Sequence, residues 1–220
     1  MNLDPGVRSS LASAVARSLE QAVAGSAAGL RGSLARGAAD PYSDIDAFWE
    51  VPDSQFSDAI DELPVTLSSV GPIESIRSDP LLQNSEKRRL VFVQFENVPL
   101  YWRVDIEVFA DSIQRDFSYD LDNSDARGDD WSLTHSALMN GVAALKWLLR
   151  GREQDARESL CRAFDRIDLP VPDESLWDQI PVLAETVGRI DLDQAELVRR
   201  LQLHYWEALA ARDAQSSREG

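Results

Sequence analysis

The 220 residues are 44% hydrophobic, enough for a sizeable core in one large domain or two small ones. The formal net charge of −16 disfavours a nucleic-acid partner, because affinity for phosphate backbones comes mainly from Lys and Arg. The single cysteine, Cys161, excludes an internal disulfide framework, and no apolar run approaches the length of a membrane span. Because the first residues also lack an apolar signal core, we expect a cytoplasmic protein without a membrane partner.

The first predicted element is an amphipathic helix over about residues 5–24, where apolar residues recur at every fourth position. A short buried strand over 27–31 should follow and lead into Gly32 and Ser33. A glycine lets the backbone approach a ligand closely, and the N–H and hydroxyl donors at a helix start suit a phosphate. We therefore expect a phosphate cradle at Gly32 and Ser33, while Arg36 either helps to hold a phosphate or forms a structural salt bridge.

Two acids, Asp44 and Asp46, follow this turn with one residue between them. If residues 43–51 form a strand, its period of two places both carboxylates on one face and Ile45 on the other. Like charges so close together repel and raise each other's pKa. Mg²⁺ relieves that repulsion, because it binds one or two carboxylates together with substrate phosphates. The pair therefore predicts a magnesium site, although on its own it would also suit two solvated turn acids.

The next segment predicts a helix over 53–64 that ends at its proline, and then a stretch over 65–78 that is hard to assign. Two strands are expected at about 89–95 and 100–109, joined by a short connection. A connection of this length makes them an antiparallel hairpin. The sheet should therefore be mixed, with helices packed on it.

The second of these strands carries a third acid. Arg103, Asp105 and Glu107 alternate there with valine and isoleucine, in the segment YWRVDIEVF. Because successive side chains of a strand point to opposite faces, Asp105 can face the acid pair while the apolar residues face the core.

Together the segments GSLARG, SDID and YWRVDIEVF resemble the signature of the polymerase-β-like nucleotidyltransferase superfamily, over about residues 25–110. The family pattern is a Gly-Ser pair, a turn, Ser-Asp-x-Asp on the next strand and a third acid on another strand. The resemblance implies that Asp44, Asp46 and Asp105 bind two Mg²⁺ ions, with ATP or another nucleoside triphosphate as co-substrate. Asp105 would complete the second metal site or act as the general base, and Glu107 would be the reserve base.

Residues 110–131 change in character, because aspartates fall here among Ser, Asn and Gly with few apolar groups to bury. These aspartates are Asp111, Asp116, Asp120, Asp122, Asp125, Asp129 and Asp130. We interpret the segment as a loop that holds the domain boundary. Its acids are either simply solvated or line a wall that receives a polycationic acceptor.

The pattern from residue 131 onward is helical, and four helices joined by short loops predict a bundle. The expected fold class is thus α+β, an N-terminal mixed-sheet nucleotidyltransferase domain followed by a C-terminal helical bundle. The expected boundaries are 1–115 for the nucleotidyltransferase domain, 116–130 for an acidic linker, 131–212 for the bundle and 213–220 for a frayed tail.

Further candidates for the site lie outside the three motifs. Lys146 is surrounded by apolar residues in the first bundle helix. Helical domains of related small-molecule nucleotidyltransferases place a lysine on the triphosphate, and Lys146 looks like the match. The alternative is a lysine at the core edge whose ammonium reaches solvent. Trp49 and Trp102 could stack a base or a sugar but are more often core residues, and His135 and His204 are interpreted as surface or core histidines.

The acceptor follows from the similarity of the whole arrangement to aminoglycoside and lincosamide nucleotidyltransferases. We expect transfer of a nucleoside monophosphate to a hydroxyl of a small, cationic acceptor, with release of pyrophosphate. Two alternatives stay open: a protein-nucleotidylating enzyme of the antitoxin kind, and a catalytically silent nucleotide-binding regulatory module. The sequence leaves open the preferred base, the hydroxyl that is modified, and whether the protein is a monomer or a homodimer.

Overall fold

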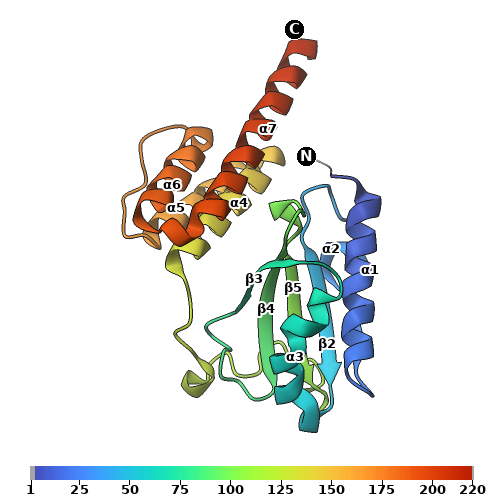
Figure 1. Cartoon of the computed structure of the whole chain (residues 1–220). Coiled ribbons are helices and arrows are strands. Elements are labelled where there is room, and N and C mark those ends of the chain that lie inside the picture. Colours follow the sequence, from blue (N-terminus) through green and yellow to red (C-terminus); the bar gives the residue numbers. More distant parts are fainter. Residues whose placement is uncertain (1–2, 220) are drawn as a thin grey trace. The chain divides into compact units, whose positions relative to one another are not determined.

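The computed structural model describes residues 3–219, which form two compact units, 3–131 and 132–219 (Figure 1). The first unit contains a mixed sheet and the second is helical. This arrangement confirms the expected α+β class, with the sheet in the N-terminal part and helices after it.

Five strands form one sheet within residues 3–131, in the order β1-β2-β5-β4-β3. Their bounds are β1 (Ala27–Leu30), β2 (Ile45–Val51), β3 (Ile73–Ser78), β4 (Arg88–Phe95) and β5 (Val104–Ala110). Strands β2 and β5 are parallel, and the other neighbours are antiparallel, so the sheet is mixed as predicted. The predicted hairpin corresponds to β4 and β5, but residues Leu100–Trp102 form a buried 3-10 turn before β5 begins.

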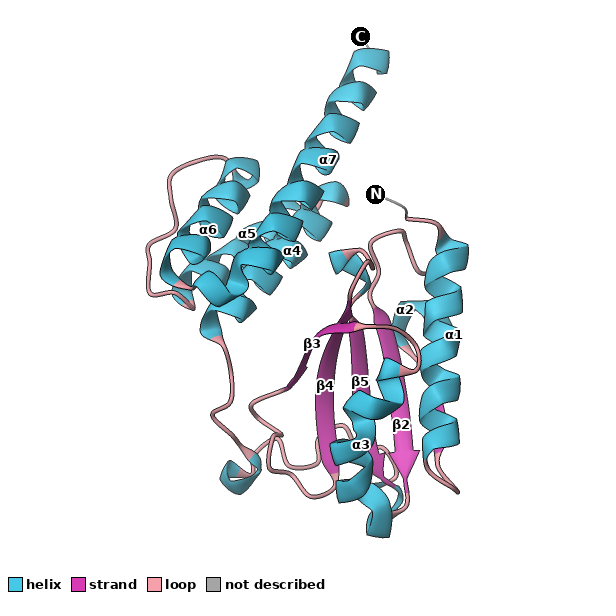
Figure 2. Cartoon of the chain, in the orientation of Figure 1, coloured by secondary structure: helices cyan, strands magenta, loops and turns pink. Residues whose placement is uncertain are grey.

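Helices α1 (Pro5–Ala22) and α3 (Phe56–Ser68) pack on one face of this sheet (Figure 2). The alternating burial along β2 and β5 explains why. The side chains of Ile45, Ala47, Trp49, Val104, Ile106 and Val108 are all 0% exposed. Every second residue of the two strands therefore lies in the core, and the residues between them lie on the other face.

The predicted end of a helix at Pro64 is wrong, because α3 continues through Pro64 to Ser68. Leu63 and Leu67, on either side of the proline, are 1% and 0% exposed. Burying these two side chains outweighs the hydrogen bond that proline cannot donate. Ser68 also donates a hydrogen bond from Oγ to the carbonyl oxygen of Pro64, at 2.7 Å.

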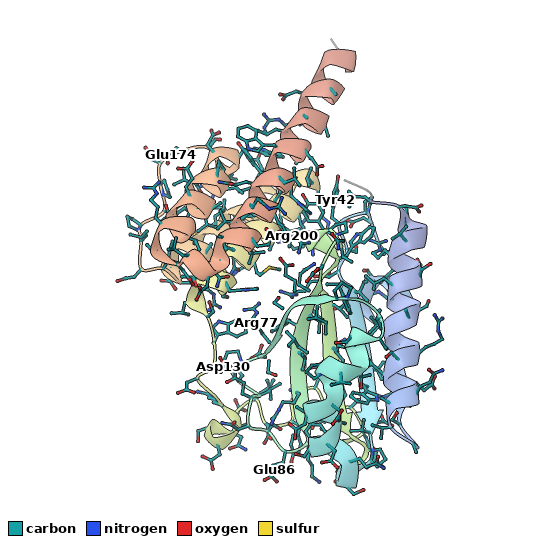
Figure 3. The ribbon with its side chains drawn as sticks, in the orientation of Figure 1. Tyr42, Arg77, Glu86, Asp130, Glu174 and Arg200 are labelled. Atoms are coloured by element: carbon teal, nitrogen blue, oxygen red, sulfur yellow. The ribbon has the colours of Figure 1, made fainter. Side chains whose placement is uncertain are left out.

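The acidic segment after β5 is hydrogen-bonded to the loop between β3 and β4. Asn84 N donates to the carbonyl oxygen of Ala126 at 2.8 Å, and Gly128 N donates to that of Pro80 at 2.9 Å. At its end, the ring of Trp131 lies 4.6 Å from the guanidinium carbon of Arg77, which Figure 3 labels on β3. The stretch predicted as a linker thus lies against the sheet unit. The exact domain limits stay a prediction.

Four helices of at least 13 residues lie between residues 132 and 219: α4 (Leu133–Leu149), α5 (Glu153–Asp165), α6 (Leu176–Ile190) and α7 (Ala195–Glu219). Their apolar faces meet in a core of Leu138, Leu145, Leu160, Phe164, Leu183 and Leu201. Most of the predicted frayed tail lies in the last turns of α7, and its Gly220 lies outside the described residues. Within residues 3–219, no helix has the length and hydropathy to cross a membrane.

His204 is a core histidine of this unit, 5% exposed, with Nδ1 lying 2.9 Å from the carbonyl oxygen of Arg200. Burial lowers the pKa of His204 to about 4, because the charged imidazolium would lose its hydration. The charge of Arg200 acts in the same direction, while its carbonyl and the charge of Glu207 oppose the shift.

A pH dependence of stability follows from this shift. The unfolded-state pKa is about 6.5, so the unfolded chain takes up the proton first as the pH falls. The native state should therefore lose about 2 kcal/mol of stability from His204 between pH 6.5 and 5. Melting temperatures from pH 7 to 5 should fall less steeply for His204→Gln than for the wild type. Equal slopes would contradict the prediction, whatever the absolute stability of the variant.

Candidate functional site

The Gly-Ser turn lies directly against Asp46. Strand β1 leads through Arg31, whose N–H donates to the carbonyl oxygen of Asp46 at 2.9 Å, into the short helix α2 (Gly32–Ala35). Gly32 has a φ of +63°, and a Cβ built there would lie 1.9 Å from Oδ2 of Asp46. Only glycine permits this approach, so the predicted cradle lies directly against Asp46, one of the two predicted acids.

Ser33 and Arg36 occupy the two ends of α2. Ser33 is half-buried, and its carbonyl oxygen accepts a hydrogen bond from Ala38 N at 2.9 Å. Arg36 follows the last residue of α2 and is exposed. A helix of four residues has too small a dipole to hold an anion by itself. A phosphate at this turn would therefore depend on the close approach that Gly32 allows, and the roles of Ser33 and Arg36 stay predictions.

Hydrogen bonds fix the turn at residues 40–43, which directly precedes Asp44. Asp40 accepts hydrogen bonds on Oδ1 from Tyr42 N, at 2.9 Å, and from Ser43 Oγ, at 3.0 Å. Arg8 of α1 is 2% exposed and donates to the carbonyl oxygens of Asp40 and Ser43. The ring of Tyr42, labelled in Figure 3, packs edge-on against Tyr101. These contacts fix the backbone that enters β2.

The three predicted acids lie on the face of the sheet that α1 and α3 do not cover. Asp46 and Asp105 are register partners on the parallel strands β2 and β5. Asp44 lies one residue before β2, but Ser43 and Ile45 on either side of it are 5% and 0% exposed, so the alternation extends to it. The sequence-based expectation that the three carboxylates share one face therefore agrees with the register.

Arg103 lies among these carboxylates, and the sequence analysis did not give it a role. Its Nε and Nη2 donate to the two carboxylate oxygens of Asp105, both at 2.6 Å. Burial lowers the pKa of Arg103, but the charges of Asp105, Asp44 and Asp46 outweigh burial and raise the pKa above its ordinary value. All three acids thus act on one guanidinium. The signal available in the sequence was its position two residues before Asp105.

The donor set is compatible with a hard cation. Asp44 and Asp46 offer carboxylate oxygens, the ligand type that Mg²⁺ prefers, in the number it usually takes beside substrate phosphates. In the part of the chain that the structure describes, no group of three or more His, Cys, Asp or Glu side chains is placed to hold a metal ion. The roles of Asp44, Asp46 and Asp105 as metal ligands therefore stay predictions.

Glu107 is engaged by two arginines. It is 2% exposed, and its Oε2 and Oε1 lie 3.1 Å from Nη1 of Arg31 and 2.7 Å from Nη2 of Arg88. A general base must come within hydrogen-bond reach of the proton that it takes. Asp105 is also held by a guanidinium, but its side chain is 15% exposed, against 3% for Glu107, so Asp105 is the more accessible of the two predicted bases. The choice of base stays a prediction.

The remaining candidates lie elsewhere. Lys146 is half-buried in the last turn of α4, in the helical unit, and its contact with a triphosphate stays a prediction. Trp49 and Trp102 are 0% and 1% exposed, and their Nε1 groups donate to Ser26 Oγ and to the carbonyl oxygen of Pro41. Both tryptophans are therefore core residues and cannot stack a base.

The turn, the acids and the mixed sheet define a class of enzyme, the nucleotidyltransferases. Residues 13–121 match the family model of the nucleotidyltransferase domain. The matched residues include β1, β2, β5 and all three predicted acids.

No curated protein matches the chain. Among solved structures, a chain of the GLD-2/RNP-8 complex is 14% identical with a TM-score of 0.32, covering 82% of this chain and 74% of its own. An antigenic nucleotidyltransferase-like protein from Paracoccidioides brasiliensis is 13% identical with a TM-score of 0.27, covering 90% of this chain and 94% of its own.

Proposed function

We propose that the chain transfers a nucleoside monophosphate from ATP, or another nucleoside triphosphate, to a hydroxyl of a small molecule such as an aminoglycoside or lincosamide. The observation that supports the proposal is that Asp46 and Asp105 are register partners on the neighbouring strands β2 and β5, and that Gly32 lies directly against Asp46. A glycine turn for phosphates and paired acids beside it are what such a transfer needs.

In the proposed reaction the acceptor hydroxyl oxygen attacks the α-phosphorus and forms a new O–P bond. The bond from that phosphorus to the oxygen bridging to the β-phosphate breaks, and pyrophosphate leaves with the electron pair. Asp105 takes the hydroxyl proton; a carboxylate has about four lone-pair sites, so two bonds from Arg103 do not exhaust them. Arg103 fixes the orientation of that carboxylate.

Asp44 and Asp46 would hold Mg²⁺, which when bound neutralises the triphosphate and stabilises charge on the transferred group. The residues around them have their own tasks in the proposal. Gly32 lets the phosphates approach the backbone, while Ser33 and Arg36 contact the phosphates. The net charge of −16 favours a cationic acceptor over an anionic polymer.

Label transfer tests the proposal directly. The full-length protein is incubated with Mg²⁺, each of four α-labelled nucleoside triphosphates, and a panel of aminoglycosides and lincosamides. We expect label on a drug and release of pyrophosphate, and both should fall to background with EDTA. Label on a protein instead would favour the antitoxin-like alternative, and nucleotide binding without pyrophosphate release would favour the silent module. Either result would overturn the proposed acceptor.

A further inference from the structure

A buried carboxylate shared by two guanidinium groups lies on the same sheet face as the acids. Glu107 pairs with Arg31 through one oxygen and with Arg88 through the other, at 3.1 and 2.7 Å. The two arginines differ in exposure: the side chain of Arg88 is 6% exposed, whereas that of Arg31 is 31% exposed. Arg31 is therefore the member of the cluster that a ligand can reach.

The loop after β5 holds both arginines in place. Arg88 donates from Nη1 to the carbonyl oxygen of Tyr119 at 3.1 Å, and the charge of Asp116 acts on it from the same loop. The guanidinium carbon of Arg31 lies 5.2 Å from the ring centroid of Phe117. That ring packs edge-on against Phe109 of β5, at 5.2 Å. Arg31 is thus held by a carboxylate and by an aromatic ring.

The backbone of Arg31 is fixed as firmly as its side chain. Its N–H bonds to the carbonyl oxygen of Asp46 on β2, while its guanidinium bonds to Glu107 on β5. Glu107 is the register partner of Phe48, so Arg31 reaches the row of residues next to the Asp46–Asp105 row. Rows two residues apart along a strand are separated by roughly 6.6 Å. A triphosphate that lies along the strands from the acids would span this distance.

Stability alone gives a weak reason for this arrangement. Replacing a buried ion pair by apolar packing is often neutral or stabilising, because burying the charges costs as much as their attraction returns. A guanidinium has five N–H donors, and among the described residues the side chain of Arg31 makes one hydrogen bond, to Glu107. The remaining donors suit the oxygens of a phosphate, to which arginine binds through two parallel hydrogen bonds.

We propose that Arg31 binds the terminal phosphates of the nucleoside triphosphate and the pyrophosphate that leaves, and that Glu107 and Arg88 are positioning residues for it. The inference rests on the proposed function, because it assigns a contact to the same substrate. It gives Glu107 a task other than that of the reserve base. Arg31 would then discriminate triphosphates from monophosphates, since only the former have phosphates in that row.

Binding measurements on the full-length protein with Mg²⁺ test the inference. Arg31→Ala should weaken nucleoside triphosphate and inorganic pyrophosphate about 10- to 100-fold, the range for losing a hydrogen bond to a charged group. Nucleoside monophosphate should change by less than about 2-fold, a few tenths of a kcal/mol. Arg31→Lys should recover part of the loss. The matched control is Arg115→Ala, which removes another half-exposed arginine of this face, paired with Glu50 at 2.7 Å.

Glu107→Gln tests whether Glu107 acts on the nucleotide through Arg31, because a purely structural role of Glu107 would give the same effect with and without Arg31. It should weaken triphosphate binding in the wild type, because Arg31 is no longer held, and change it little when Arg31 is already alanine. Thermal unfolding is measured on each variant, so that a folding defect is recognised.

The outcomes separate the inference from the proposed function. A wild type that binds none of the four triphosphates would overturn both. A wild type that binds a triphosphate, with Arg31→Ala binding it equally well, would overturn the inference alone. An equal loss for monophosphate and triphosphate would also overturn it, because Arg31 would then support the turn without contacting the terminal phosphates.

Discussion

Replacing Asp46 by asparagine should lower nucleotidyl transfer about 1000-fold, equivalent to ~4 kcal/mol of transition-state stabilisation. The change keeps the shape of the side chain but removes the charge that would hold Mg²⁺ beside the phosphates. The backbone contact from Arg31 to the carbonyl oxygen of residue 46 does not depend on that charge. The variant should therefore fold, and it should lose activity without losing stability.

The stability of this variant is itself informative. Asp46 lies beside its register partner Asp105, whose charge repels it, but the charge of Arg103 attracts it, so removing the charge of Asp46 has two opposing effects on stability. The free energy of unfolding should stay within about 1 kcal/mol of the wild type or rise slightly. Label transfer and chemical denaturation measure the two effects on the same samples. A drop in stability with no drop in transfer would contradict the placement of Asp46 in the site.

A matched control and an assay in cells complete this test. Asp61→Asn makes the same chemical change at an exposed position of α3 and should leave transfer unchanged. If the acceptor is an antibiotic, the wild type should protect sensitive cells and Asp46→Asn should not. Equal protection by both would refute a mechanism in which this carboxylate takes part.

The placement of the acids on one face could be predicted because it depends on strand periodicity alone. Every second residue of β2 and β5 is apolar and faces the core, so the residues between them must lie on the other face. This alternation can be read directly from the sequence. The register that makes Asp46 and Asp105 neighbours could not be predicted in the same way. It depends on how two strands far apart in the chain align, which local patterns do not determine.

The carboxylate partners of the arginines in the site could not be predicted from the sequence. Arg31 and Arg88 pair with Glu107 from 76 and 19 residues away. Their partners emerge only once β1, β2 and β5 are aligned for Arg31, and β4 and β5 for Arg88. Arg103 is nearer to its partner Asp105, and the period of two places both side chains on one face, but the pattern alone does not show that they bond. Composition gave a hint, because almost all the basic residues of this acidic chain are arginines. Arginine is the cation suited to bidentate pairing with carboxylates.

The second prediction with a large effect concerns Gly32. A Cβ at this position would lie 1.9 Å from Oδ2 of Asp46, so Gly32→Ala must displace either the turn or the carboxylate. Transfer should fall at least about 100-fold, ~3 kcal/mol, since a displacement near 1 Å costs that much in a positioned site. The left-handed φ of +63° adds about 1–2 kcal/mol of strain to the folded state.

Strain and displacement can be separated with a second glycine. Gly25 has a φ of +82°, and the nearest atom to a Cβ there is Cγ of Pro52 at 3.8 Å, an ordinary contact. Gly25→Ala should therefore lower the melting temperature by a similar few degrees, about 2–4 °C per kcal/mol, with transfer nearly unchanged. Kinetics and thermal unfolding of the two variants measure the difference. If Gly32→Ala transferred nucleotide as well as Gly25→Ala, the close approach of the turn to Asp46 would have no part in the reaction.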